Sequence, residues 1–401
     1  MNPRDVVIVS ACRTPIGKNM GQFKDVRARE LAITAGAEAI KRADIDAKII
    51  EEIVMGECFT AMEGSLAARQ VSMRLGFCET SNACVVNQNC ASGMRALDIA
   101  SCNIQLGKED VAMVIGVESM TNAPYVLDKA RMGYRMGDGK IYDNMLHDGL
   151  IDELSGGHMG LTAENVAEKY GITREECDAV AVRSHNLACK AIEDGSFKDE
   201  IVPVVLHTRK GDKVITDDEH PIRNCTLETL AKLKPAFKKG GVITAANASG
   251  INDAAAAVIL MSWEKCQELG KKPMAKLLHC AAEGVAPEVM GLGPAVAIPK
   301  ALKKAGVKFE DIDYFEVNEA FSAQVLGVEK MLAEQGMIVD WNKMNKFGSG
   351  IALGHPVGCT ALRIIVTLVY EMIRSDYKLG CASLCVGGGP ALASIWSRDF
   401  S

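Results

Sequence analysis

Apolar runs and helical patterns alternate along the first third of the chain. Residues 5–10 (DVVIVS) form a β-branched apolar run, which is typical of a strand buried on both faces. A helical period follows over residues 31–42, and a second one begins after residue 90. Two more strand-like runs, EEIVMGE at 51–57 and VAMVIGVES at 111–119, separate the helical stretches. This alternation predicts an α/β unit built on a largely parallel, buried sheet.

The last third of the chain repeats this order. MAKLLHCAAEG (274–284), DIDYFEVNE (311–319) and CASLCVGGG (381–389) are strand-like, and helical runs span 294–304 and begin again at residue 360. FEDIDYFEVNE is similar to DAKIIEEIVMGE from the first third, and GCTALRIIV is similar to NCASGMRALDI. We therefore infer two copies of one supersecondary unit.

The stretch between these thirds has a different character. Glycine-rich polar turns (RMGYRMGDGK, SGGHMG) and a charged segment (TRKGDKVITDDEHPIRN) flank a helical run over residues 162–190. We expect a folded insertion of loops and helices that covers one face of the sheets and contacts the ligand, with a simple spacer as the alternative. The predicted division is an N-terminal half at 1–120, an inserted loop domain at 121–245, the rest of the N-terminal half at 246–272 and a C-terminal half at 273–401.

The composition is that of an ordinary globular protein. Of the 401 residues, 48% are hydrophobic and 24% are charged, with a formal net charge of -6. This balance gives no broad cationic field, so neither nucleic acid nor an anionic membrane surface is an expected partner. The N-terminus lacks the long apolar region of a secretory signal, and the apolar stretches at 254–261 and 364–373 are shorter than the roughly 20 residues of a transmembrane helix. We expect a cytoplasmic protein.

The chain contains 14 cysteines. Without an export signal, they indicate free thiols in a reducing compartment. No pair has the CxxC spacing of a zinc site, so no metal site is expected. Most of them, such as Cys102, Cys189 and Cys266 in helical stretches, are expected to be small buried apolar residues.

Two glycine-flanked motifs place a reactive side chain just before an expected helix. Cys90 lies in NQNCASG, where small residues open the helix, so its sulfur should lie near unpaired N–H groups and the positive end of the helix dipole. That environment favours the thiolate, which is the nucleophilic form. His355 lies in ALGHPVG, where Gly354 and Pro356 should form a tight turn and Pro356 can open the helix. A buried cap cysteine and a core histidine are the structural alternatives.

A third motif, CVGGG, begins with Cys385. The glycines after it carry no side chains, so backbone N–H groups there, that of Gly387 first, can approach an oxyanion. A structural cysteine at a strand end is the alternative. Together with Cys90 and His355, Cys385 completes a Cys, His, Cys constellation.

With these three motifs the sequence resembles the thiolase family along essentially its whole length. The resemblance implies a layered αβαβα architecture with two similar halves and an inserted loop domain, assembled as a dimer or as a dimer of dimers, a homotetramer. The other segments that carry it are SACRTPIGK (10–18), HMGLTAENVA (158–167), LKPAF (233–237), NASGIND (247–253), MGLGP (290–294) and NEAF (318–321).

The resemblance also implies a role for each reactive group. Cys90 carries the acyl group, while His355 takes its proton and later helps to bind the thioester oxygen of the second substrate. Cys385 exchanges a proton with the α-carbon of that substrate. Asn318 holds a water that donates to the enolate oxygen, and Glu319 beside it organises the turn.

Contacts with coenzyme A are implied in the same way. Ser249 should contact the pantetheine arm, Arg223 should lie near the adenine nucleotide, and His158 should lie near the thioester. Taken singly, the apolar contacts also fit an ordinary core, and Arg223 fits a solvated surface charge. The expected apolar contacts are Leu150, Met159, Phe237, Met290 and Phe321.

The function that follows is acetyl-CoA C-acetyltransferase, a reversible condensation of two acetyl-CoA molecules to acetoacetyl-CoA and CoA by double displacement. Coenzyme A is then substrate and product, and no cofactor is expected. The alternatives are a degradative 3-ketoacyl-CoA thiolase of β-oxidation and a non-catalytic acyl-CoA-binding protein on the same fold. The chain departs from the family pattern at Ala361 and at Pro390, which stiffens the loop beside Cys385. These changes put rate and chain-length preference in question, not the reaction type.

Overall fold

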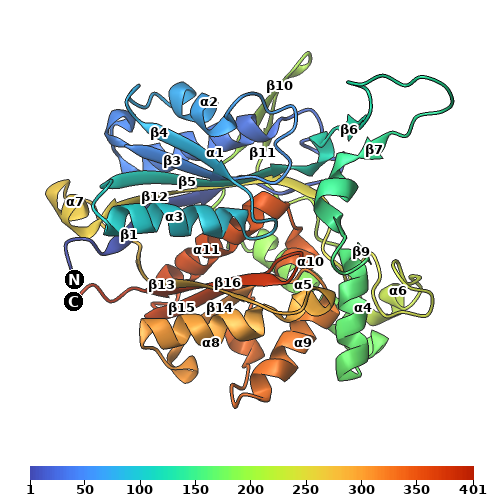
Figure 1. The fold of residues 1–401 in the computed structure, drawn as a ribbon. Coiled ribbons are helices and arrows are strands. Elements are labelled where there is room, and N and C mark those ends of the chain that lie inside the picture. The colour runs from blue at the N-terminus through green and yellow to red at the C-terminus, as the bar shows by residue number, and fades with distance from the viewer.

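The computed structural model describes residues 1–401. Their helices and strands are arranged in five layers (Figure 1). The strands of the two halves form two layers, and α3 (Ser92–Gln105) and α11 (Val357–Arg374) lie between them. Helix α1 (Ala28–Ala43) covers the outer face of the first strand layer, and α8 (Pro294–Ala305) covers the outer face of the second. This is the αβαβα arrangement that the resemblance implies. The remaining helices of the two halves are α2 (Ala67–Arg74), α7 (Trp263–Glu268), α9 (Ser322–Ala333) and α10 (Gly350–Leu353).

The two halves share one strand order, which confirms the inferred repeat. Strands β3, β5, β12 and β1 lie side by side in the first half, and β14, β15, β16 and β13 follow the same order in the second. The layers join only where Val7 and Ile8 of β1 pair with Lys276 and Ala275 of β13. The strands are β1 (Val6–Arg13), β3 (Glu52–Gly56), β4 (Asn82–Val86), β5 (Val111–Ser119), β12 (Asn252–Ser262), β13 (Ala275–Gly284), β14 (Tyr314–Val317), β15 (Leu379–Cys385) and β16 (Pro390–Ser397), with the short β2 (Gly17–Lys18) beside β12.

The expectation of a largely parallel sheet is wrong. Only β3 with β4, β3 with β5 and β14 with β15 are parallel, whereas the long strands β1, β12, β13 and β16 pair antiparallel to their neighbours. Continuous apolar runs arise because helices cover both faces of each strand layer. Such runs indicate that a strand is buried on both faces, but they do not indicate whether its neighbours are parallel or antiparallel.

Three apolar cores fill the spaces between the layers. Along β1, Val6 and Ile8 face the middle core, while Val7 and Val9 face the core under α1, as the twofold period of a strand requires. Helix α11 is buried on nearly all sides because it is packed between both strand layers, and its buried residues include Arg363 and Glu371. Its first residue is Val357, so Pro356 is the N-cap residue and does not occupy the first helical position.

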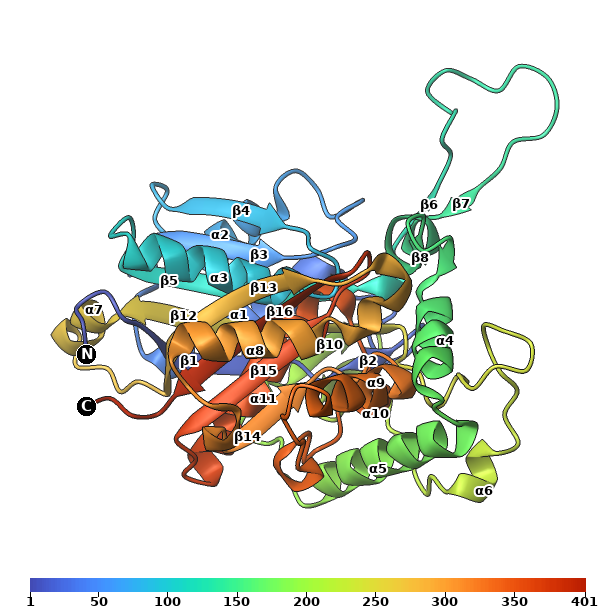
Figure 2. The same cartoon turned by 60° about the horizontal axis from the view of Figure 1, so that its bottom comes forward.

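The segment between β5 and β12 combines hairpins and helices. The predicted helical run at 162–190 is two helices, because Gly171 adopts a left-handed conformation (φ 61) and ends the first of them. The loop after β6 projects far from the body (Figure 2). The elements of this segment are β6 (Tyr125–Val126), β7 (Tyr142–Asp143), a π-helical turn (Leu146–Leu150), β8 (Ile151–Asp152), β9 (Gly157–His158), α4 (Met159–Tyr170), α5 (Arg174–Glu193), β10 (Val204–Thr208), β11 (Gly211–Ile215) and α6 (Leu227–Leu230).

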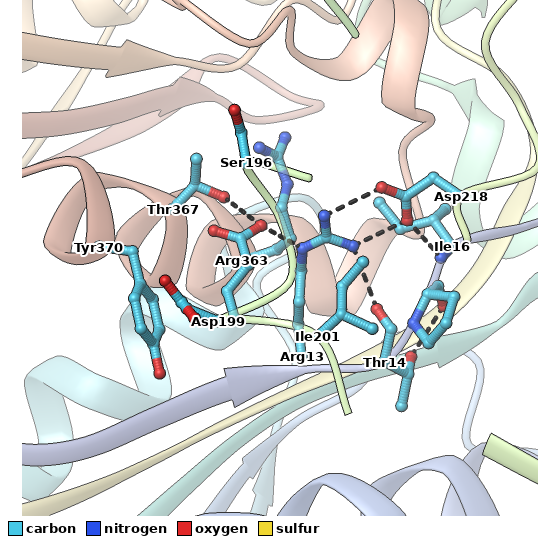
Figure 3. A network of polar contacts seen from close by, with 12 residues as sticks. Arg13, Thr14, Ile16, Ser196, Asp199, Ile201, Asp218, Arg363, Thr367 and Tyr370 are labelled. Carbon is cyan, nitrogen blue, oxygen red and sulfur yellow. Dashed lines mark hydrogen bonds and ion pairs between the residues drawn. The ribbon is translucent and has the colours of Figure 1, made fainter. Parts of the chain in front are cut away.

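A fully buried arginine fastens this segment to the core (Figure 3). Arg13, at the end of β1, donates to Glu200 at 2.6 Å and to both carboxylate oxygens of Asp218 at 2.7 and 2.9 Å. Thr367 of α11 donates to the same oxygen of Glu200 at 3.2 Å. The arginine of the SACRTPIGK motif is therefore a structural anchor.

The cysteine expectation holds only in part. Cys266 is buried, but Cys189 is partly exposed and Cys102 is exposed, because the last lies on the solvent side of α3. None of the helices combines the length and the apolar character that crossing a bilayer requires.

Candidate active site

A cavity of about 240 Å³ lies where both halves and the inserted segment meet. It brings Cys90, His355 and Cys385 together from positions far apart in the sequence. Its wall also includes Leu150, His158, Met159, Phe237, Ser249, Met290 and Phe321, all of them sequence-predicted contacts.

Cys90 lies two residues before α3 and is almost fully buried. Asn89 before it adopts a left-handed backbone conformation (φ 45). Burial raises the pKa of the Cys90 thiol to about 11, although the backbone N–H groups of Gly387 and of Cys90 itself oppose the rise. In the ligand-free site this favours the thiol over the expected thiolate, because burial raises the pKa by more than the two backbone N–H groups lower it.

His355 is held in one tautomer by its neighbours. Thr360 Oγ1 lies 2.9 Å from the carbonyl oxygen of Pro356 and 2.6 Å from Nδ1 of His355. We assign the hydroxyl proton to that carbonyl, so that Nδ1–H donates to Oγ1. Nε2 then carries the lone pair, and it has no hydrogen-bond partner in the protein. Asn252 Oδ1 accepts the backbone N–H of His355 at 2.9 Å and fixes the turn.

The imidazole of His355 is neutral in the resting site. Burial and the charge of Arg363 lower its pKa to about 3. A neutral ring with a free Nε2 is an acceptor for the proton of a neighbouring thiol. Cys90 and His355 thus form an uncharged thiol and imidazole pair.

Cys385 ends β15 and is buried beside Cys90. Burial, followed by the nearby sulfur of Cys90, raises the pKa of its thiol well above the ordinary range. A Cβ at residue 387 would lie 1.9 Å from Cε of Met159, so a side chain there would displace the end of that methionine. Pro390 takes the first position of β16, where a strand tolerates the missing N–H.

His158 offers a hydrogen-bond donor to the cavity. Its Nδ1 accepts the backbone N–H of Gly160 at 3.0 Å, so in the neutral ring Nε2 carries the proton. Burial lowers the pKa of His158, which favours that neutral form. Its ring stacks on Phe237 with centroids 4.6 Å apart, and Phe237 meets Phe321 edge to face.

Three predicted residues are not among those that line the cavity. Gly387 lies beside the wall residue Met159 and directs its backbone N–H at the sulfur of Cys90. Arg223 is exposed and faces Glu193 at 3.8 Å. Asn318 is fully buried behind the wall, and neither its amide nitrogen nor its amide oxygen has a protein partner. Glu319 beside it accepts from Ser184 and from Asn345, so it organises the turn without reaching the cavity.

Sequence reasoning missed several residues of the site. Thr360 stands four residues after Pro356, a spacing at which a helical hydroxyl can reach the carbonyl one turn earlier, even though that carbonyl also accepts backbone N–H groups. Asn252 lies in the NASGIND motif, but nothing in the sequence indicates its bond to His355. The other missed wall residues are Met120, Gly149, Gly250, Ile251, Ala320 and Val357.

Known proteins resemble this chain over nearly its whole length. A family model for the thiolase N-terminal domain matches residues 6–264, and one for the thiolase C-terminal domain matches residues 271–398. The acetyl-CoA acetyltransferase of Syntrophomonas wolfei is 51% identical over 394 residues, with 98% of each chain covered. That of Escherichia coli is 46% identical over 396 residues, covering 98% of this chain and 99% of the relative.

Solved structures agree with these matches. The structure of acetyl-CoA acetyltransferase from Syntrophomonas wolfei has a TM-score of 0.98 at 61% identity, covering 98% of this chain and 99% of that chain. Human mitochondrial 3-ketoacyl-CoA thiolase has a TM-score of 0.95 at 37% identity, covering 99% of this chain and 100% of that chain. The chain therefore belongs to the thiolase family.

Proposed function

We propose that this chain is an acetyl-CoA C-acetyltransferase that transfers an acetyl group through Cys90. The observation that carries the proposal is one cavity that holds two thiols and a neutral histidine, with a backbone N–H directed at the first sulfur. The names of the relatives at 51% and 46% identity support acetyl-CoA as the substrate.

The first half-reaction acylates Cys90. Its proton passes to Nε2 of His355 as the sulfur attacks the thioester carbon of acetyl-CoA. The N–H of Gly387 donates to the oxyanion, and collapse of the tetrahedral intermediate expels CoA as its thiolate. That thiolate takes the proton of Cys385, which leaves a Cys385 thiolate beside a protonated His355.

The second half-reaction forms the carbon–carbon bond. The Cys385 thiolate removes a proton from the α-carbon of a second acetyl-CoA, while Nε2–H of His355 donates to the developing enolate oxygen. The enolate carbon attacks the acetyl group on Cys90, and Cys90 leaves and recovers its proton from His355. The Cys385 proton leaves on CoA and is replaced by one from the α-carbon, so every side chain regains its starting protonation state, and we propose that protein side chains suffice without a cofactor.

Asn318 and the apolar wall complete the proposed substrate site. A buried amide without a protein partner is suited to hold a water that donates to the enolate oxygen. Ser249, Leu150 and Met290 would contact the pantetheine arm and acyl group along the cavity, and Arg223, outside it, would meet the adenine nucleotide. A solved structure of human mitochondrial 3-ketoacyl-CoA thiolase is a complex with CoA, which supports coenzyme A as the ligand class.

The test is acetoacetyl-CoA thiolysis and acetyl-CoA condensation with wild type and Cys90→Ala side by side. We expect activity on both in the wild type and a loss on the order of 10³-fold or more in the variant, because the acyl carrier is gone. No turnover by the wild type would remove the enzymatic proposal and favour an acyl-CoA-binding role.

An acyl-chain series separates the two thiolase types. Apolar walls distinguish chains by only about 0.8 kcal/mol per methylene, so a short-chain enzyme should show a gradual decline from four-carbon to longer 3-ketoacyl-CoAs. Rising kcat/KM at six carbons and beyond would assign the chain to degradative β-oxidation instead.

Assembly and location are also proposed. Edge strand β4 pairs only with β3, and its residues are partly exposed, which supports self-association as a dimer or a dimer of dimers. A cytoplasmic location is proposed from the resemblance and from the sequence pattern, and fractionation of the source cell tests it.

A further inference from the structure

One buried carboxylate that does not line the cavity accepts hydrogen bonds from backbone segments next to the site residues. Glu118 lies near the end of β5 and is fully buried. Its Oε1 accepts the N–H of Phe59 at 3.1 Å, and its Oε2 accepts those of Cys58 at 3.1 Å and Gly358 at 2.8 Å. Three N–H donors on one carboxylate join segments far apart in the sequence, of which the one at Gly358 is 240 residues from Glu118.

The bond to Gly358 holds the start of α11, three residues after His355. The first N–H groups of a helix have no partner within it, and a carboxylate there also meets the positive end of the helix dipole. A Cβ at Gly358 would lie 2.5 Å from the carbonyl oxygen of Val117 and 2.8 Å from Oε2 of Glu118. The second glycine of GHPVG therefore lets the histidine turn approach β5 closely.

The other two bonds lead to the nucleophile and to the cavity wall. The thiol of Cys58 donates to the carbonyl of Asn89 at 3.2 Å, directly before Cys90. The ring of Phe59 packs against Gly149, where a Cβ would lie 2.3 Å from its Cζ, and Gly149 lines the cavity.

We propose that Glu118 is a positioning residue for acyl transfer, whose shared carboxylate fixes the separation of Cys90 from His355 and the position of the wall at Gly149. It touches no reacting atom and acts through the three segments that it joins. The inference rests on the proposed function.

Among the titratable groups packed around this carboxylate, Glu118 is the one that carries the negative charge near pH 7. The titratable groups near it are Glu57, Cys58, Cys90 and Cys359, and burial raises the pKa of all three thiols, so they stay neutral near pH 7. Burial, followed by the charge of Glu118, raises the pKa of Glu57 to about 9, so this carboxyl is neutral as well. Burial raises the pKa of Glu118 to about 7, against its three N–H bonds. Below that pH a proton occupies one oxygen, the shared bonds weaken, and kcat should fall.

The experiment compares Glu118→Gln with Glu57→Gln, two isosteric changes at neighbouring buried glutamates. A glutamine at 118 keeps one acceptor but turns an NH2 group toward backbone N–H donors, whereas a glutamine at 57 replaces a carboxyl that is already neutral. For thiolysis of acetoacetyl-CoA by Glu118→Gln we expect kcat to fall roughly 10- to 100-fold, with KM within about threefold of wild type. Its acid limb near pH 7 should disappear, while Glu57→Gln keeps the wild-type kcat and the limb.

Three results would overturn the inference: wild-type kcat in Glu118→Gln, an equal loss in Glu57→Gln, or a lowered kcat with the acid limb unchanged. Should circular dichroism show that Glu118→Gln is unfolded, Glu118→Asp and Glu57→Asp replace the pair. The shorter side chain retracts the acceptor, so only the change at 118 should lower kcat, and equal values would refute the role. A wild type without thiolysis would refute the proposed function itself, which is a distinguishable outcome.

Discussion

At the scale of single residues, the thiol proposed as the nucleophile is protonated in the free protein. The pKa of Cys90 is raised to about 11 and that of His355 is lowered to about 3, both chiefly by burial. Neither group is charged at rest, so the pair avoids the cost of a buried ion pair in the free protein. Proton transfer must then accompany attack on the thioester, which makes the direction of the Nε2 lone pair decisive.

Thr360 sets that direction through its contact with Nδ1 of His355. Replacing it with valine removes the hydroxyl and keeps nearly the same side-chain shape. In Thr360→Val the ring loses the acceptor for Nδ1–H and can adopt the tautomer with a proton on Nε2, which cannot take the proton of Cys90. We expect kcat to fall on the order of 10²-fold or more, as when another catalytic histidine loses the group that sets its tautomer. Turnover and the ¹⁵N shifts of the His355 ring measure rate and tautomer independently.

Thr360→Ser is the matched control, because it retains the hydroxyl and should retain both rate and tautomer. Unchanged ¹⁵N shifts in Thr360→Val would show that another group sets the tautomer. A rate loss in both variants would point to packing by the methyl group.

Local motifs revealed the reactive residues but not the residues that support them. Cys90, His355 and Cys385 each stand beside glycine in a short segment that the sequence displays directly. Glu118 carries no such local signal, because its partner Gly358 is 240 residues away and only the packing of α11 on β5 brings them together.

At the scale of secondary structure elements, β1 depends on the arginine at its end. Arg13 holds Glu200 and Asp218, and all three side chains are almost fully excluded from water. Because these partners belong to the segment that precedes β12, the network ties the inserted chain to the end of a core strand (Figure 3).

Arg13→Ala should therefore destabilise the fold strongly. It leaves two buried carboxylates without their counter-charge, and losing one partner of a buried ion pair costs about 3–5 kcal/mol. Urea unfolding measures the change, and Arg74→Ala, which breaks an ion pair with Glu30 that is about half exposed, should cost only about 0–1 kcal/mol. Equal losses in the two variants would mean that the buried network adds nothing beyond a surface pair.

Element positions were predictable, whereas strand directions were not. The apolar runs at β1 and β5 and the helical period at α1 appear in the sequence because whether a position is buried decides which residue type stands there. Direction depends on how the chain returns between strands. Strand β12 runs antiparallel to both β1 and β5 after an insertion whose path no local pattern encodes.

At the scale of the whole molecule, the site exists only because the two similar halves pack against each other. Cys90 precedes α3 in the first half, whereas His355 and Cys385 belong to the second. Cys90 and His355 lie just before the two inner helices, Cys385 lies at the end of β15, and the inserted segment supplies part of the wall over them. The internal similarity of the sequence predicted two copies of one unit and the family resemblance implied the layers, but the meeting point of the segments depends on how those layers pack.

Two exposed features of the surface favour assembly beyond one chain. The loop between β6 and β7 extends from the body (Figure 2) and exposes large apolar side chains that are unfavourable in water. Edge strand β4 offers unpaired backbone groups at another surface. We expect β4 to form the dimer and the loop to join two dimers. The loop side chains are Leu127, Met132, Met136 and Ile141, exposed by 48%, 86%, 99% and 66%.

Replacing residues 129–139 with a short Gly-Ser linker should halve the mass measured by light scattering, from four chains to two, and leave the far-ultraviolet circular dichroism unchanged. Val85→Lys in β4 places a charge on the pairing edge and should give monomers. A linker variant that keeps the wild-type mass would assign the exposed loop another role. We expect the loop to be needed only for the contact between dimers. A monomeric linker variant would therefore mean that the loop, and not β4, forms the dimer.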